Sequence, residues 1–250
     1  MKRRAILIEA SNVKGQDDLP GARVDIKNYT QYLTSQAGGY WYPDELVTLN
    51  KPSLATLNAE IKKAEFEAEY LFISFSGHGY MKRPPANVFP APSETTLTIL
   101  CLNDTQEISL SQINPTIKNF VIVDSCRQLE KLVKAMKIQD MMAFAESRSV
   151  NVARVIFDNA VRDAGPGQII AYSCGVNETA GEDPNRGGFF SAAMMECGFN
   201  LSKTGQQRAI PTDQVFECAY RSVKTVAAQQ NPKYLPGRRI GSHFPFAVKG

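Results

Sequence analysis

Short apolar runs alternate with amphipathic segments along the whole chain. The runs occupy residues 5–8, 46–49, 70–75, 97–102, 120–123 and 168–172. Three of them, I-L-I, L-F-I-S-F and F-V-I-V, show no alternation of apolar and polar positions. This is typical of strands that are covered on both faces of a parallel sheet.

The segments between these runs carry apolar residues at helical spacing. They include residues 26–33, 54–61, 129–136 and 156–161. A last helix is expected from residues 211–212, with Thr212 as its capping residue. This alternation predicts an α/β fold, with a mainly parallel central sheet and helices on both faces.

Two of the buried runs end in residues that carry chemistry. Residues 70–79, Y-L-F-I-S-F-S-G-H-G, place His78 between two glycines, which let the backbone turn sharply and leave the Gly79 N–H facing open space. Residues 120–127 are F-V-I-V-D-S-C-R. Ligands of open α/β sheets bind at the carboxyl ends of the strands. We therefore expect two neighbouring inner strands that bring His78 and Cys126 together.

Each motif has an ordinary structural alternative. A lone histidine is more often a packed core residue than a catalyst, although His78 has little to pack against between two glycines. A lone cysteine is usually a small buried hydrophobe, the role assigned to Cys101, Cys174, Cys197 and Cys218. Cys126 differs because Arg127 and the start of an expected helix both favour its thiolate. Together, in the order His then Cys, the motifs predict a catalytic dyad.

Composition narrows the functional classes. The 250 residues are 43% hydrophobic, and 28 basic against 25 acidic residues lack the basic surplus of nucleic-acid binders. Five scattered cysteines and two histidines argue against a zinc site and against a disulfide framework. The first apolar run stops at Glu9, too short for a signal peptide, and no stretch approaches the ~20 apolar residues that cross a bilayer. We expect a cytoplasmic protein with reduced thiols and no nucleic-acid or membrane partner.

S-G-H-G after a buried strand, followed by D-S-C-R after another, resembles the caspase-fold peptidases. The likeness is greatest to metacaspases, paracaspases and their bacterial homologues, the peptidase C14-like proteins. Residues 19–33 resemble the segment where those families carry a conserved aspartate, and residues 169–183 resemble their next strand and specificity loop. G-G-F-F-S-A-A-M-M resembles the helix of their small-subunit half. The chain departs from the D-S-C-x-S-G of many metacaspases, since it reads D-S-C-R-Q-L.

The resemblance implies a caspase-hemoglobinase fold, as a single domain over residues 1–250. Its large-subunit-like half would end at about residue 145, and its small-subunit-like half would begin at about residue 150. It also implies a cysteine endopeptidase that needs no metal or organic cofactor. The Cys126 thiolate would attack the scissile carbonyl, and the N–H groups of Gly79 and Cys126 would stabilise the oxyanion. His78 would protonate the leaving amine, and water would hydrolyse the thioester.

Specificity can be argued from charge. Asp124 shares a strand face with Cys126. In the resembling families, residues that match Asp124, Asp25 and Ser76 line a pocket for a basic side chain before the cleaved bond, the P1 residue. Two carboxylates in one pocket repel each other, and an arginine fork can satisfy both. Glu178 is a further candidate on its loop position alone. Ordinary alternatives remain: Asp25 could be a solvated helix residue, Asp124 a helix cap and Ser76 a turn residue.

Other readings of the sequence fit less well. A caspase-like scaffold that binds partners without catalysis would be expected to lack the histidine or the cysteine. A dinucleotide-binding enzyme would need G-x-G-x-x-G after the first strand. Arg148, Lys82 and Arg83 are candidates for self-processing, while Asn103-Asp104 and Glu182-Asp183 are too sparse for a calcium site. The predicted partner is a protein or peptide substrate, and the identity of any activating partner stays open.

Overall fold

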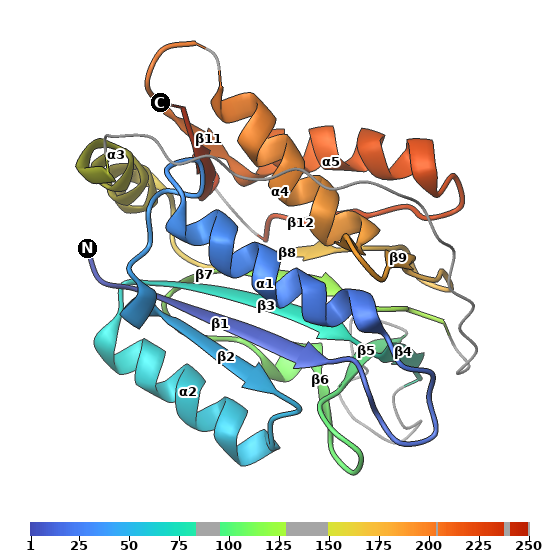
Figure 1. Cartoon of the computed structure of the whole chain (residues 1–250). Helices are drawn as coiled ribbons and strands as arrows, with labels where there is room; N and C mark the ends of the chain where they lie inside the picture. Colours follow the sequence, from blue (N-terminus) through green and yellow to red (C-terminus); the bar gives the residue numbers. More distant parts are fainter. Residues whose placement is uncertain (84–95, 129–149, 204, 238–240, 250) are drawn as a thin grey trace.

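A six-stranded sheet forms the centre of the computed structural model, which describes residues 1–83, 96–128, 150–203, 205–237 and 241–249. Its order is β12-β8-β7-β3-β1-β2 (Figure 1). The strands are β1 (Arg3–Ala10), β2 (Leu46–Asn50), β3 (Tyr70–Gly77), β7 (Lys118–Asp124), β8 (Gln168–Tyr172) and β12 (Lys233–Leu235). All neighbours are parallel except β12, which is antiparallel to β8. The predicted α/β fold with a mainly parallel sheet is confirmed.

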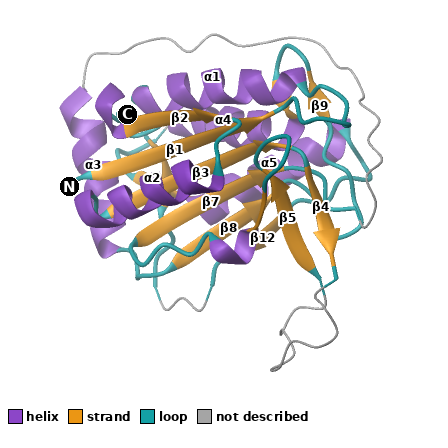
Figure 2. Ribbon diagram, turned by 90° about the horizontal axis from the view of Figure 1, so that it is seen from below, coloured by secondary structure: helices purple, strands orange, loops and turns teal. Residues whose placement is uncertain are grey.

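Helices cover both faces of this sheet (Figure 2). One face packs against α1 (Pro20–Thr34), α3 (Val150–Asp163), α4 (Phe189–Ser202), α5 (Thr212–Val226) and the strand β13 (Pro245–Val248). The other face packs against α2 (Leu54–Glu67). Within β3, Tyr70 and Phe72 belong to the first core, while Leu71 and Ile73 belong to the second. Both faces of the strand are therefore buried, which explains its uninterrupted apolar run.

Three smaller sheets and two short 3-10 turns complete the described structure. β4 (Gly79–Lys82), β5 (Leu97–Cys101) and β6 (Glu107–Ser109) form an antiparallel sheet, β9 (Glu182–Asp183) and β10 (Gly187–Gly188) a hairpin, and β11 (Ala209–Pro211) pairs with β13. The 3-10 turns are η1 (Pro43–Glu45) and η2 (Leu110–Gln112). The run at residues 97–102 is thus a strand, but it lies outside the central sheet.

The pairing of β3 with β7 decides where the two sequence motifs meet. The strands are parallel neighbours, with Ser76 opposite Asp124 at their carboxyl ends. This confirms the expectation of two neighbouring inner strands. His78 and Cys126 each follow two residues after this pair, so both leave the sheet at the same edge.

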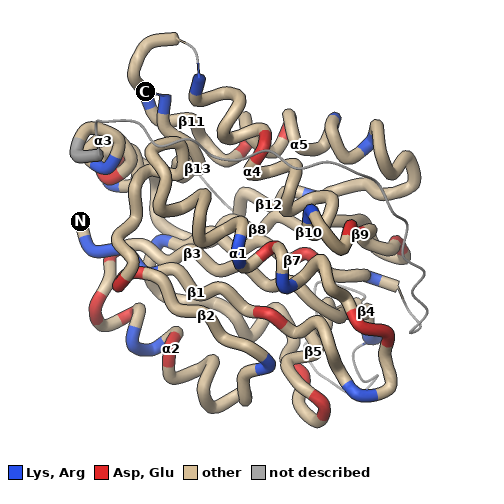
Figure 3. Tube along the Cα trace, in the orientation of Figure 1, with Lys and Arg blue, Asp and Glu red and all other residues tan. Residues whose placement is uncertain are grey.

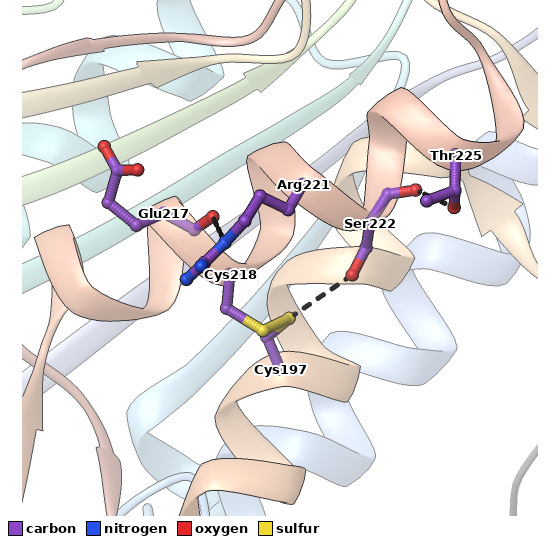
Figure 4. The surroundings of a disulfide bond; sticks show 6 residues. All are labelled: Cys197, Glu217, Cys218, Arg221, Ser222 and Thr225. Carbon is purple, nitrogen blue, oxygen red and sulfur yellow. Dashed lines mark hydrogen bonds between the residues drawn. A yellow bond between two sulfur atoms is a disulfide. The ribbon is translucent and has the colours of Figure 1, made fainter.

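Several local predictions are wrong or fall outside the described residues. Thr212 is the first residue of α5 rather than its cap, and its hydroxyl contacts the Tyr234 hydroxyl at 2.6 Å. Cys197 and Cys218 are not free thiols, because packing of α4 against α5 brings their Cα atoms to 5.9 Å and the two form a disulfide (Figure 4). Such a pairing cannot be deduced from spacing in the sequence. The helix predicted at residues 129–136 and the self-processing candidate Arg148 lie outside the described residues.

Candidate active site

His78 lies directly after the buried strand β3 and is itself buried, with 2% of its surface exposed. Its Nε2 is 2.7 Å from the carbonyl oxygen of Asp17. A carbonyl only accepts hydrogen bonds, so Nε2 carries the proton and Nδ1 is the basic nitrogen of the neutral ring. This contact fixes the orientation of the imidazole.

The glycines on either side of His78 let the backbone pack closely against neighbouring segments and do not form a sharp turn. Neither has a positive φ. A Cβ on Gly77 would lie 2.6 Å from the carbonyl oxygen of Ala10, and one on Gly79 would lie 2.6 Å from the Ser125 hydroxyl oxygen. The expectation that these two glycines let the backbone turn sharply at His78 is therefore wrong.

Gly79 begins β4, where it pairs with Leu100. The Cys101 N–H donates to the carbonyl of His78 at 3.0 Å, which makes Gly79–Leu100 a pair of the non-hydrogen-bonded kind. In such a pair the Gly79 N–H is not bonded to the partner strand. This geometry is compatible with a donor for an oxyanion.

Cys126 is half-buried and follows β7. Its sulfur accepts a hydrogen bond from the Ala180 N–H at 3.4 Å. Burial raises the pKa of the Cys126 thiol against this hydrogen bond, and the charges of Asp124 and Glu182 raise it further. The thiol is therefore the favoured form in the unliganded protein, and a base has to accept its proton.

The expectation that Arg127 favours the thiolate is wrong. Its guanidinium lies over the Tyr172 ring, 4.0 Å from the ring centroid, and donates to the carbonyl of Cys174 at 3.3 Å. Its backbone N–H donates to the carbonyl of Glu178 at 2.9 Å. Arg127 therefore fastens the segment after Cys126 to the loop after β8.

An acidic cavity opens beside Cys126. It is narrow, with about 30 Å³ of free space, and its lining includes Cys126, Ser76 and three carboxylates. The carboxylates belong to Asp25 on α1, Asp124 at the end of β7 and Glu182 on β9. Figure 3 shows acidic positions on these elements at one end of the sheet. The structure thus brings Asp25, Ser76 and Asp124 together, as the resemblance implied, and adds Glu182.

The three carboxylates are held by the N-terminal ends of two helices. Asp25 Oδ1 accepts the Gly188 N–H at 3.0 Å, and Asp124 Oδ2 accepts the N–H and the hydroxyl of Ser191 at 3.0 and 2.7 Å, at the start of α4. Glu182 accepts backbone N–H groups of Gly21 and Ala22, at the start of α1. Asp124 therefore does serve a helix, but this helix is α4 rather than one following Cys126.

The side chains in this cavity resist ionisation. Burial, followed by the charge of Asp124, raises the pKa of Asp25 well above its ordinary value. Burial also raises the pKa of Asp124, against the hydrogen bonds from Ser191. Burial, followed in size by the opposing Gly21 N–H and then by the charge of Asp124, moves the pKa of Glu182 to about 7. A cation entering the cavity would relieve these costs.

Glu178 does not line the acidic cavity. Its carboxylate accepts the Gly175 N–H at 2.8 Å, and the backbone and side-chain N–H groups of Asn231 at 2.8 and 2.7 Å. It ties the loop after β8 to the segment after α5. The side chain nearest in role to the one expected of Glu178 is Glu182, which the sequence suggested only as a sparse calcium candidate.

The remaining predictions concern the exposure of basic residues, metal binding and membrane-spanning helices. Lys82 and Arg83 are exposed. Among the described residues, no group of three His, Cys, Asp or Glu side chains is placed to hold a metal ion. In the same part of the chain, no helix is long and apolar enough to cross a membrane.

The chain is similar to known proteins at the level of a family model and of the fold. The family model of the caspase domain, peptidase C14, matches residues 2–237. The crystal structure of caspase-1 from Spodoptera frugiperda is similar in fold, with a TM-score of 0.56 at 13% identity, over 94% of this chain and 86% of that one. No curated protein sequence matches the chain.

Proposed function

The chain belongs to the caspase family of cysteine peptidases, and from this premise we propose that it is an endopeptidase that cleaves after arginine or lysine. The observation that carries the proposal is the acidic cavity beside Cys126, with Asp25, Asp124 and Glu182 in its lining. A P1 aspartate would meet like charge there, at a cost of several kcal/mol when desolvated. A P1 cation would instead relieve the repulsion already present.

The wall of the cavity beside the acids is built from glycine. The free space of about 30 Å³ is about the volume of one water molecule in the liquid, so the lining has to move apart to admit an arginine or lysine side chain. A Cβ on Gly188 would lie 2.2 Å from Asp124 Oδ2, and one on Gly187 would lie 2.1 Å from Asp25 Oδ1. Only glycines at these two positions let the β10 backbone lie this close to the carboxylates of Asp124 and Asp25. Arginine can bond more than one carboxylate at once through its fork of N–H groups.

The mechanism uses His78 as the base that the raised thiol pKa requires. His78 Nδ1 accepts the proton of the Cys126 thiol, and the thiolate attacks the carbonyl carbon of the scissile bond. The N–H groups of Gly79 and Cys126 stabilise the oxyanion. His78 then gives its proton to the leaving amine, and water hydrolyses the thioester to release the acid and restore the thiol.

Matched fluorogenic peptides that differ only at P1 test this function. We expect the wild-type protein to cleave the Arg and Lys peptides and to spare the Asp peptide. Cys126→Ala and His78→Ala should each abolish cleavage while circular dichroism remains unchanged. Asp124→Asn should lower kcat/KM for the Arg peptide by tens-fold, on the order of 2 kcal/mol for a charge-assisted bond.

Other outcomes separate the parts of the proposal. Cleavage after Asp, or cleavage after Arg that is indifferent to Asp124, Asp25 and Glu182, would reject the basic pocket and leave the dyad standing. Peptide binding without cleavage by the wild-type protein would favour the caspase-like scaffold instead.

A further inference from the structure

The loop of residues 11–19, which connects β1 to α1, contacts the imidazole of His78. Its Asp17 carbonyl accepts the hydrogen bond from His78 Nε2 at 2.7 Å. The bond that one ring nitrogen of a histidine makes decides which nitrogen carries the proton. The position of this single carbonyl therefore decides which nitrogen of His78 is free to take the Cys126 proton, and where that nitrogen points.

A forked ion pair holds the residue next to this carbonyl. Both oxygens of the Asp18 carboxylate accept hydrogen bonds from the guanidinium of Arg23 on α1, at 2.8 and 2.6 Å. A peptide unit is planar, and the unit that contains the Asp17 carbonyl also contains the Cα of Asp18. The bonds to the Asp18 side chain therefore limit how far the Asp17 carbonyl can move.

The same guanidinium also binds the first residue of the loop. Arg23 Nη1, which bonds Asp18, donates to the Ser11 hydroxyl at 2.7 Å. The Ser11 carbonyl accepts the Leu19 N–H at 3.1 Å, which closes the base of the loop. The Ser11 N–H donates to the buried carboxylate of Glu9, on β1, at 2.7 Å. Arg23 therefore ties the part of the loop that contacts the imidazole to both β1 and α1.

The surroundings of this ion pair favour a role in positioning over a role in folding. The side chains of Arg23 and Asp18 are 46% and 45% exposed, and exposed ion pairs contribute little to stability. The hydrogen bond from Arg23 is the largest influence on the pKa of Asp18, which is lowered against burial, and the charge of His78 lowers it further. The pair is therefore close enough to His78 to act on it through charge as well as through the backbone.

We propose that Arg23 is a positioning residue for His78, and that it acts through the Asp18 carboxylate on the carbonyl that His78 binds. It holds the imidazole in the tautomer and the orientation that accept the Cys126 proton. Arg127 fastens the segment after Cys126, so each member of the dyad has an arginine that holds its loop. The effect of Arg23 on the reaction rate rests on the proposed function, whereas its effect on the imidazole does not.

Nuclear magnetic resonance of the histidine rings tests the positioning without any need for peptidase activity. The chain has two histidines, and His78→Ala assigns their signals. In ¹⁵N-labelled Cys126→Ala protein at pH 8, where an ordinary imidazole is neutral, we expect the His78 proton on Nε2. Arg23→Met and Asp18→Asn should each give a mixture of the two tautomers, which moves the ¹⁵N shifts of the two ring nitrogens toward each other. The His243 signals should stay unchanged.

Cleavage of the Arg peptide measures the consequence for the reaction. With Cys126 in place, Arg23→Met should lower kcat by about tenfold or more and change KM by less than about threefold, because a displaced base affects the reaction more than binding. Arg23→Lys should restore only part of this loss, since lysine lacks the planar fork. The double variant with Asp18→Asn should be no slower than Arg23→Met alone, because the two side chains act as a unit.

Arg4→Met is the matched control, because it breaks an ion pair with Glu60 at the other end of β1. It should leave kcat and the His78 signals unchanged. Neither Arg23→Met nor Asp18→Asn should shift the melting temperature by more than about 4 °C. Unchanged His78 signals in both variants overturn the positioning role, and so does an unchanged kcat in Arg23→Met when the wild type cleaves. If the wild type cleaves no peptide, the proposed function fails, and the His78 signals alone decide the positioning role.

Discussion

Glu182 offers a direct test of the acidic cavity through pH. Its pKa is raised from 4.5 to about 7, first by burial and then by neighbouring acids, against the N–H groups of Gly21 and Ala22. A guanidinium that restores the ordinary value of 4.5 would stabilise the ionised form of Glu182 by about 3 kcal/mol. For this single group, that stabilisation makes binding about 25-fold tighter at pH 8 than at pH 5.5.

The assay measures binding of an acetylated peptide amide that ends in arginine to Cys126→Ala protein, by calorimetry between pH 5.5 and 8. Removal of the thiol keeps its titration out of the result. We expect affinity to rise with pH, with release of a proton on binding near pH 6. Glu182→Gln, which keeps an acceptor for the α1 N–H groups, should flatten this rise and weaken binding at pH 8. Glu217→Gln, an exposed acid on α5, is the control and should match the parent.

A pH profile that is the same with and without Glu182 would refute this reasoning, because the raised pKa is its only basis. Protein stability and peptide binding depend on pH in opposite directions: binding strengthens as pH rises, whereas the stability that Glu182 contributes falls. Without a cation, the native protein holds a proton on Glu182 that the unfolded chain has already released above pH 4.5. The stability that Glu182 contributes therefore falls as pH rises from about 4.5 to about 7, and Glu182→Gln should remove this loss in urea titrations.

Three further predictions concern the surroundings of the site. Gly188→Ala should raise KM for Arg peptides by at least about tenfold, because its Cβ would lie 2.2 Å from Asp124 Oδ2, and an unchanged KM would contradict the geometry. Arg127→Ala should cost about 1–3 kcal/mol of unfolding free energy in urea, and Arg127→Lys should restore only part of it, since lysine lacks the planar fork. Alkylation of the unfolded, unreduced protein should modify Cys101, Cys126 and Cys174 but spare Cys197 and Cys218. Reduction of the disulfide should cost about 3 kcal/mol of stability for a loop of this length. Alkylation of all five cysteines without reductant would show that the disulfide is absent.

The parts of the fold that the sequence predicts are those set by local patterns. The buried runs at residues 70–75 and 120–123 are strands, and their polar ends predict the edge where His78 and Cys126 emerge. Asp25 and Ser76 are different. Only the resemblance to a family placed them beside Asp124, because residues on α1, β3 and β7 meet through tertiary packing that no local period encodes.

The parts that the sequence missed depend on contacts between distant segments. Glu182 enters the cavity because its hairpin packs against the start of α1, and nothing in the pattern E-D-P-N-R-G-G shows which acid will face inward. Glu178 and Glu182 are four residues apart and carry the same carboxyl group. Only Glu182 faces the cavity, because Glu178 accepts a hydrogen bond from the Asn231 side chain. The disulfide likewise follows from α4 and α5 lying side by side.

The contrast between Glu178 and Glu182 also bears on whether the acids of the cavity merely hold the fold together. Asp25, Asp124 and Glu182 all bond backbone N–H groups at helix starts, a role that by itself lowers a carboxyl pKa. Glu178 bonds backbone N–H groups in the same way, and although burial is the largest single influence on it, its hydrogen bonds prevail and its pKa is lowered. In the cavity the balance is reversed: the three acids keep raised pKa values despite their hydrogen bonds. A purely structural role does not require three acids to be buried against one another beside a cysteine, and the binding of a P1 cation, as we propose, would recover the cost of that arrangement.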